Sequence, residues 1–226
     1  DIDLNVSREM LQNNPAVAKI SKSLVGKILK ELKKVSEKNV DGYKEFWKEY
    51  GAVLKEGLYE DAERKQTLLD LCRFSTNEND EIISLSSYLE KMPETQKDIY
   101  YISAETRSQA LASPHLEGFK SKNIPILIMT DATDQFWLPM IGSFKDKKFT
   151  SITQGQINLD ELDEKNKDKK SDSKDQKEKQ DKEFIDLIAQ MKVVLGEQVK
   201  DIRLSSKLTD SPVCLVADDG DMDIAM

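Results

Sequence analysis

Residues 125–130, which read Pro-Ile-Leu-Ile-Met-Thr, limit the folds open to this chain more than any other stretch. The run is short and apolar on both faces, as expected for a strand that is covered on both sides in a parallel sheet. Helical crossovers between successive strands make the strands parallel and the connections right-handed. Residues 75–160 are therefore predicted to form a small α-β-α layer sandwich with a short parallel sheet. The other expected strands and helices of this α/β fold lie at 82–92, 98–102, 104–122, 134–141 and 148–152.

A unit of three helices is predicted before the sandwich, over residues 13–74. Asn14 and Pro15 pair a favoured N-cap residue with a proline in the first turn. Asp41 is expected to cap the second helix, whose aromatic residues should lie inside. A third helix is expected at 61–74, and the three helices should pack antiparallel. The first helix has one apolar stripe at helical spacing that we expect to face the core, formed by Ile20, Leu24, Ile28, Leu32 and Val35.

The chain changes character at residues 161–182, which we interpret as a linker. Between 163 and 182 there is no apolar side chain, and eight lysines alternate with seven acidic residues. Such a segment buries too little surface to offset its ordering entropy, so we expect it to be mobile. An amphipathic helix that ends near Gly196 should follow, and then two strands at 199–205 and 213–217.

The predicted organisation has five parts. The last part is too small to hold a core by itself, and the chain opens on Asp1 rather than Met, so we expect a fragment of a larger protein. The class is α/β, or α+β when both domains are counted. The parts are a leading loop at 1–12, the three-helix unit at 13–74, the sandwich at 75–160, the linker at 161–182 and the truncated start of a second α+β domain at 183–226.

Composition and charge exclude several classes of protein. The formal net charge of −8 over 226 residues argues against a nucleic-acid partner, because phosphate binding calls for a basic patch. No apolar run is long enough to cross a membrane and no leader opens the chain, so we expect a cytoplasmic protein without a membrane partner. Cys72 and Cys214 lie far apart in apolar settings, so buried free thiols are expected and no metal site.

Arg8 and Gln12 are candidate functional residues near the start of the chain. They stand four residues apart, so they share one face if the segment is helical. The planar fork of Arg8 is suited to a phosphate group, and Gln12 can orient a water or an oxyanion beside it. The alternative is that Arg8 is an ordinary surface arginine.

A second candidate lies on the predicted helix at 134–141. Phe136, Trp137 and Met140 cannot all face inward together with Leu138 on so short a helix. The apolar surface that remains exposed is a candidate site for a protein partner. Ordinary core packing of these side chains is the alternative.

Two classes of catalytic site find little support in the residues. The turn at 103–107 after the first sandwich strand has no glycine, which excludes a dinucleotide fingerprint and a Walker loop there. Asp131 follows a strand and is a conceivable phosphoacceptor, but only Asp98 represents the acidic cluster that such a site needs. From the residues alone, the chain is an acidic α/β interaction module.

Longer motifs extend this interpretation, because they follow one another in a fixed order along nearly the whole chain outside the linker. They lie at 4–12, 46–51, 54–57, 74–76, 98–102, 113–117, 129–131, 199–205 and 208–212. In this order they resemble the bacterial members of the ninety-kilodalton heat-shock chaperone family. The resemblance covers the later part of that family's middle domain and the first part of its C-terminal domain.

The resemblance implies a role in an ATP-dependent molecular chaperone. In this family the arginine of an Asn-Val-Ser-Arg-Glu motif reaches the terminal phosphate of ATP bound in the N-terminal domain. Arg8 is therefore the expected catalytic-loop residue and Gln12 its support. ATP and Mg are expected to bind to the parent protein, and neither is expected to bind to this fragment. The expected partner of the fragment is the N-terminal ATP-binding domain of the same parent protein.

The resemblance also implies contacts with unfolded or partly folded client proteins, which we expect near Phe136, Trp137 and Met140. The parent protein is expected to hydrolyse ATP and to form a homodimer, whereas the fragment alone should do neither. The alternative function is that of a scaffold module for protein interactions with no catalytic connection.

Overall fold

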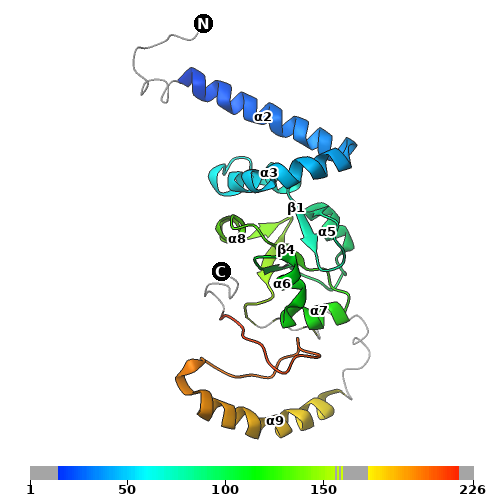
Figure 1. Ribbon diagram of the computed structural model, residues 1–226, viewed down its shortest axis with the longest axis vertical. Coiled ribbons are helices and arrows are strands. Elements are labelled where there is room, and N and C mark those ends of the chain that lie inside the picture. Colours follow the sequence, from blue (N-terminus) through cyan, green and yellow to red (C-terminus); the bar gives the residue numbers. More distant parts are fainter. Residues whose placement is uncertain (1–14, 156, 158, 160–172, 219–226) are drawn as a thin grey trace. The chain divides into compact units, whose positions relative to one another are not determined.

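The computed structural model describes residues 15–155, 157, 159 and 173–218 (Figure 1). The predicted leading loop, with Arg8 and Gln12, lies outside the described residues. The described chain divides into two compact units. We call them the helical unit, with residues 15–74, 82–87 and 131–144, and the α/β unit, with the other described residues.

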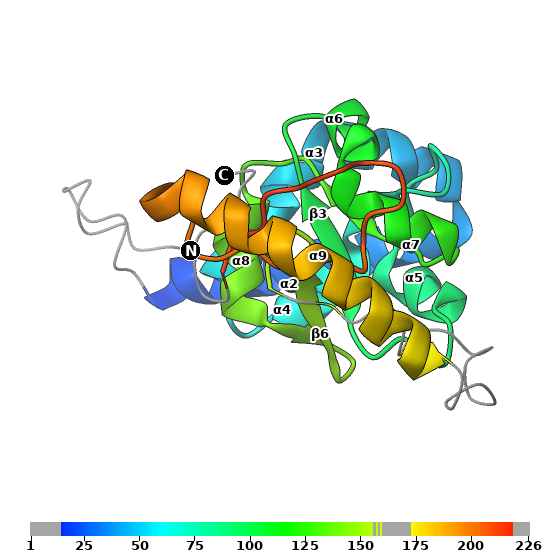
Figure 2. The same cartoon turned by 90° about the horizontal axis from the view of Figure 1, so that it is seen from below.

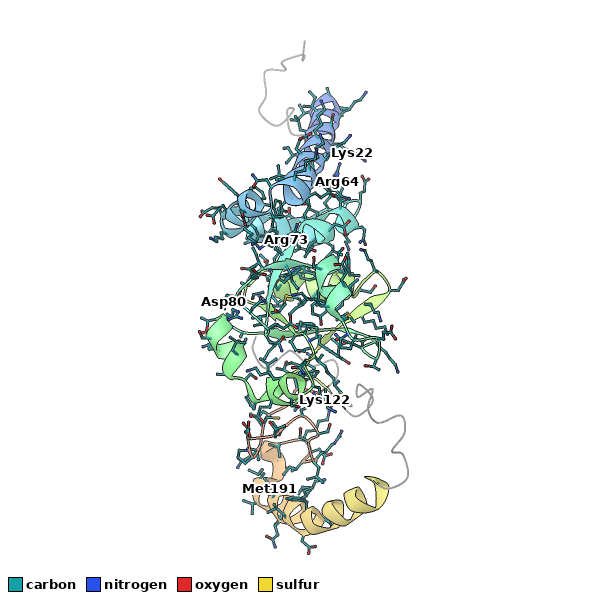
Figure 3. The ribbon with its side chains drawn as sticks, turned by 90° about the vertical axis from the view of Figure 1, so that its right-hand side faces the viewer. Lys22, Arg64, Arg73, Asp80, Lys122 and Met191 are labelled. Atoms are coloured by element: carbon teal, nitrogen blue, oxygen red, sulfur yellow. The ribbon has the colours of Figure 1, made fainter. Side chains whose placement is uncertain are left out.

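The helical unit contains the three predicted helices and a fourth. They are α2 (Pro15–Lys38), α3 (Val40–Glu60), α4 (Lys65–Leu71) and α8 (Asp134–Ile141). Asn39 caps α3, because its side chain accepts a hydrogen bond from the backbone N–H of Gly42 at 3.0 Å. Asp41, the predicted cap, lies inside the helix instead. Near the start of α4, the Arg64 guanidinium donates to the carbonyl oxygen of Lys22 on α2 at 3.3 Å (Figure 3).

The inward face of α2 differs from the predicted one. Ile20, Leu24 and Ile28 are all exposed, with 46% to 56% of their surface open. The buried residue is Leu29, and Leu32 lies half-buried on the same side. The helix is therefore turned by about 100°, one residue, from the expected orientation. Two apolar stripes run along α2, and the spacing alone does not indicate which of them packs on α3 and α4.

The C-terminal end of α4 is closed by Arg73. Its guanidinium donates to the carbonyl oxygens of Asp70 at 3.1 Å, Leu71 at 3.0 Å and Cys72 at 2.9 Å, which have no partner inside the helix. The same guanidinium lies over the ring of Tyr43, 4.7 Å from its centre, while the Tyr43 hydroxyl donates to Leu71. Burial raises the pKa of the Cys72 thiol to about 12, so the predicted buried free thiol is confirmed at this position.

The sheet has six strands in the order β2-β1-β4-β3-β6-β5. The three predicted strands are present, and β3 is parallel to both β4 and β6. The sequence pattern does not predict the other three, of which β1 is antiparallel to β2 and β4, so the sheet is mixed. The strands are β1 (Arg73–Thr76), β2 (Ile83–Ser84), β3 (Ile99–Ser103), β4 (Leu127–Met129), β5 (Ser143–Phe144) and β6 (Lys147–Ser151).

An apolar cluster of buried side chains joins the sheet of the α/β unit to its helices. Thr106 begins α6 with a capping box to Gln109, and the expected break at Ser113 and Pro114 separates α6 from α7. The short helices are α5 (Leu85–Lys91), whose first three residues belong to the helical unit, α6 (Arg107–Ala112), η1 (Pro114–Leu116) and α7 (Glu117–Ser121). The residues of this cluster are Tyr100, Ile102, Ala110, Leu116, Phe119, Ile124, Ile126, Ile128, Ile152 and Leu159. The predicted α/β class is thus confirmed.

The C-terminal part departs most from the prediction. Helix α9 (Ser173–Leu195) includes residues 173–182 of the predicted linker, and η4 (Gly196–Gln198) follows it (Figure 2). The strands predicted at 199–205 and 213–217 do not form, and the segment makes one isolated bridge, from Ala217 to Gln154. Within the described residues, no helix has the length and apolar character needed to cross a membrane.

Candidate interaction surface on helix α8

Helix α8 begins and ends at the predicted residues. It runs from Asp134 to Ile141, and Gly142 closes it with a positive φ of 67°. The backbone N–H of Gly142 donates to the carbonyl oxygen of Leu138 at 3.1 Å. Glycine adopts this left-handed conformation without the steric cost that a side chain brings, so the helix stops here.

The apolar side chains of α8 divide between two faces. Trp137 and Leu138 are buried, whereas Phe136 is 56% and Met140 57% exposed. Phe136 and Met140 stand four residues apart, so they lie on the same side of the helix. Part of the apolar surface of α8 therefore stays exposed, as expected, and Phe136 and Met140 provide it. Trp137 is core, and its side chain offers no surface to a partner.

Asp134 fixes the orientation of α8 from inside. One carboxylate oxygen, Oδ1, accepts a hydrogen bond from Trp137 Nε1 at 2.8 Å. The ammonium group of Lys55 on α3 lies 2.8 Å from the same oxygen and 3.0 Å from Oδ2. The backbone N–H of Asp131 donates to Oδ2 at 3.2 Å. The carboxylate therefore joins α3, the start of α8 and the turn that precedes it.

Lys55 is the cation of this network and is itself buried. Its side chain is 4% exposed, and its ammonium group also lies 2.5 Å from Asp131 Oδ2. Burial alone would lower the pKa of Lys55, but the carboxylates of Asp134 and Asp131 outweigh it and raise the pKa above its usual range. Lys55 therefore stays charged, and the buried ion pair is satisfied by hydrogen bonds on both sides.

Aromatic rings complete the packing around the network. The Lys55 ammonium lies 4.9 Å from the centre of the Phe74 ring, and Phe74 packs on Trp137 with ring centres 6.1 Å apart. On the outer side, Phe136 lies against Tyr59 of α3, with ring centres 5.9 Å apart. We call Tyr59, Phe136 and Met140 the α8 patch.

The α8 patch is suited to binding apolar groups. Aromatic and methionine side chains are common at the centres of protein interfaces, where their large surfaces leave water. Asp131, the conceivable phosphoacceptor, is paired with Lys55. Of the residues that the structure describes, no group of three or more His, Cys, Asp or Glu side chains is placed to hold a metal ion.

The buried network is the part of the site that the sequence pattern does not reveal directly. A signal is nevertheless present on α3, whose buried residues are Tyr43, Trp47, Gly51, Lys55 and Leu58. Their spacing of four, four, four and three places a lysine on the inward face of an amphipathic helix. A buried lysine needs a carboxylate partner, but the sequence does not indicate which of the chain's acidic residues supplies it.

Comparison with known proteins gives consistent matches along the chain. The family model described as Hsp90 protein matches residues 1–226. A chaperone protein HtpG of Roseobacter denitrificans is 46% identical over 99% of this chain, and that of Mycobacterium avium is 42% identical over 96%. These matches cover 35% and 33% of the two relatives, so the chain spans about a third of their length.

A solved structure supports the same assignment at the level of the fold. It is the middle domain of a Plasmodium falciparum protein classified as a heat shock protein. The similarity has a TM-score of 0.58 and 31% sequence identity, and it covers 63% of this chain and 60% of that one.

Proposed function

This chain belongs to the Hsp90 protein family, and on that premise we propose that it is a middle-domain part of an ATP-dependent chaperone. In this proposal the α8 patch contacts client proteins, and Arg8 acts on ATP that is bound by another domain of the longer protein. The exposure of Phe136 and Met140 on a helix whose buried side is anchored by Asp134 and Lys55 carries the client-binding part.

The anchoring supports binding because it holds apolar side chains in water without letting them collapse inward. Trp137 is the positioning residue in this proposal, since its ring packs on Phe74 and its N–H is bound by Asp134. Phe136 and Met140 make the contact. Unfolded chains expose apolar side chains, and an exposed aromatic–methionine surface adapts to many of them.

The client-binding proposal is tested with Phe136→Ser/Met140→Ser in the longer protein. Suppression of the aggregation of a heat-unfolded protein should fall at least about threefold, because most of the apolar contact area is removed. Val53→Ser is the matched control, since Val53 is 61% exposed on α3 of the same unit. Both variants should give a cooperative unfolding transition in urea, which shows that they are folded. Equal suppression by the double variant and the control would remove the α8 patch from client binding.

The catalytic part of the proposal assigns Arg8 to the terminal phosphate of ATP, with Gln12 as its support. The turn after β3 has no glycine that would let the backbone cradle a phosphate, and no acidic cluster among the described residues is placed to hold Mg. A cation supplied from a separate domain behaves like an arginine finger, which stabilises developing charge only when the domains close.

Arg8→Ala in the longer protein should slow ATP hydrolysis at least about 10-fold and leave nucleotide affinity nearly unchanged. Lys33→Ala is the control, because Lys33 is an exposed cation on the neighbouring helix α2. Hydrolysis is measured in single-turnover experiments, and affinity by nucleotide titration. Normal hydrolysis by Arg8→Ala would favour the alternative, a scaffold module without a catalytic connection.

A further inference from the structure

Residues 207–217 follow α9 and η4 and run past α7 within the α/β unit (Figure 2). We call them the strap. Glu117, the first residue of α7, holds the middle of the strap: its Oε2 accepts hydrogen bonds from the backbone N–H groups of Thr209 at 2.8 Å, Asp210 at 2.9 Å and Ser211 at 3.1 Å. Its Oε1 accepts a further bond from the Ser211 hydroxyl. One carboxylate therefore binds three consecutive residues.

The N-terminal end of the strap is held by a second set of polar contacts. The backbone N–H of Gly118 donates to the carbonyl oxygen of Lys207 at 2.7 Å. The Lys207 ammonium donates to the carbonyl oxygens of Ile152 at 3.1 Å and Gly155 at 3.3 Å, and the residue is only 5% exposed. The approach to α7 is close, because a Cβ at position 118 would lie 2.6 Å from the Lys207 oxygen.

The far end of the strap is also held by backbone bonds rather than by apolar packing. Ala217 donates to the carbonyl oxygen of Thr153 at 3.0 Å and accepts from the N–H of Gly155 at 3.0 Å. Val213 and Leu215, which lie between the two attachments, are 63% and 69% exposed. When the strap detaches, its hydrogen bonds to the rest of the α/β unit would be replaced by hydrogen bonds to water. Little new apolar surface would be uncovered at Val213 and Leu215.

Polar attachments of this kind open at a lower free-energy cost than a packed core. We propose that the strap is a releasable latch that sets the position of the C-terminal part of the chain on the α/β unit, with Glu117 as its positioning residue. The latch joins two motifs, at 113–117 and 208–212, that the chaperone proposal leaves without a role. It involves neither Arg8 nor the α8 patch, so it does not depend on that proposal.

Hydrogen exchange of the intact chain tests the latch. In Glu117→Gln, the amides of Thr209, Asp210 and Ser211 should exchange at least about 10-fold faster, because charge-assisted bonds are replaced by weaker neutral ones. Amides of β3 and β4 should keep their rates. Glu90→Gln is the control, since Glu90 is exposed on α5 and belongs to the same unit. Unchanged strap exchange, or equal acceleration of the strap and of β3 and β4, would overturn the proposal.

Gly118→Ala tests the same latch through a steric clash, without changing any charge. The added methyl group would lie too close to the Leu159 side chain and to the Lys207 backbone; the side chain can turn away, whereas the backbone cannot, so the strap should be released with Glu117 still present. The chain provides its own probe, because Cys214 is half-buried in the strap and Cys72 is buried in the helical unit. A thiol reagent should label Cys214 at least about fivefold faster in both variants, with Cys72 unaffected. Wild-type labelling rates at Cys214 in both variants would contradict the latch.

Discussion

At the scale of single residues, the placement of helices depends on charged side chains that are buried. Lys55 shows this most clearly, since its ammonium group is surrounded by Asp134, Asp131 and the Phe74 ring. A buried ion pair adds little stability over an apolar pair of the same shape, but the loss of one partner leaves an uncompensated charge in the interior. The network therefore ties the placement of α8 to the presence of both partners.

Lys55→Met should lower the free energy of unfolding by about 3–5 kcal/mol, because Asp134 then stays buried without its cation. Urea denaturation followed by circular dichroism measures the change. Lys48→Met is the control, since Lys48 pairs with Glu45 on the exposed side of the same helix. Ion pairs in water add little stability, so this variant should unfold at nearly the same urea concentration as the wild type. Similar losses for the two variants would show that burial of Lys55 has no energetic consequence.

Glu117 should titrate far below an ordinary glutamate. The hydroxyl of Ser211 and the backbone N–H groups of Asp210, Thr209 and Ser211 favour its ionised form and lower its pKa from 4.5 to about 2. Because the folded-state pKa is lowered, the stabilisation by Glu117 is complete above about pH 4.5 and is lost as the pH falls toward 2. Carbon NMR of the carboxyl group measures the midpoint. A midpoint near 4.5 in the folded chain would show that the clamp does not form.

At the scale of helices and strands, α2 has two similar apolar stripes, and packing against the rest of the helical unit determines which of them is buried. Leu29 is buried at 6% exposure, whereas Leu24, five residues earlier, is 52% exposed. Only the Leu29 side of the helix is packed, so only that side should contribute strongly to stability.

Leu29→Ala should therefore cost about 2–5 kcal/mol, whereas Leu24→Ala should cost less than about 1 kcal/mol. The two variants are chemically identical changes in one helix, which makes each the control of the other. Their free energies of unfolding come from urea titration. A larger loss for Leu24→Ala would restore the orientation that the spacing of Ile20, Leu24 and Ile28 predicts.

Elements whose limits are set by residues within or next to them in the sequence are predictable from the sequence. Asp134 and Gly142 mark the two ends of α8, and the apolar run at 125–130 contains β4. The sequence also indicates that some apolar surface of α8 stays exposed, because a short helix cannot bury every apolar side chain on it, but it does not indicate that Phe136 is exposed and Trp137 buried.

Elements that depend on distant partners were not predictable. The segments at 199–205 and 213–217 have strand-like composition, but in the part of the chain that the structure describes they form no hairpin. The N–H groups of the intervening turn bind the carboxylate of Glu117, which is more than ninety residues away in the sequence. Nothing near Glu117 in the sequence indicates this partner, just as nothing near Lys55 indicates Asp134.

At the scale of the whole molecule, charge opposes association through the exposed apolar surface. The net charge is −8 at pH 7, and the isoelectric point is about 5.0. Like charge keeps copies of the chain apart at neutral pH, and this repulsion vanishes near the isoelectric point.

Light scattering of the chain should therefore rise as the pH is lowered from 7 to 5 and fall again when the pH is restored. The triple variant Ile20→Ser/Leu24→Ser/Ile28→Ser removes the exposed stripe of α2 and should reduce the rise at least about twofold. Scattering that is independent of pH, or equal in the variant, would show that this stripe does not drive association.

Two buried lysines among the described residues have a practical consequence for following this protein in solution. Lys55 is 3% exposed in the helical unit, and Lys207 is 5% exposed in the α/β unit. An amine-reactive reagent acylates accessible ammonium groups, so both residues should be spared while their own unit is folded. Peptide mapping of the acylated chain during denaturation would then follow the unfolding of each unit separately, without any residue being replaced.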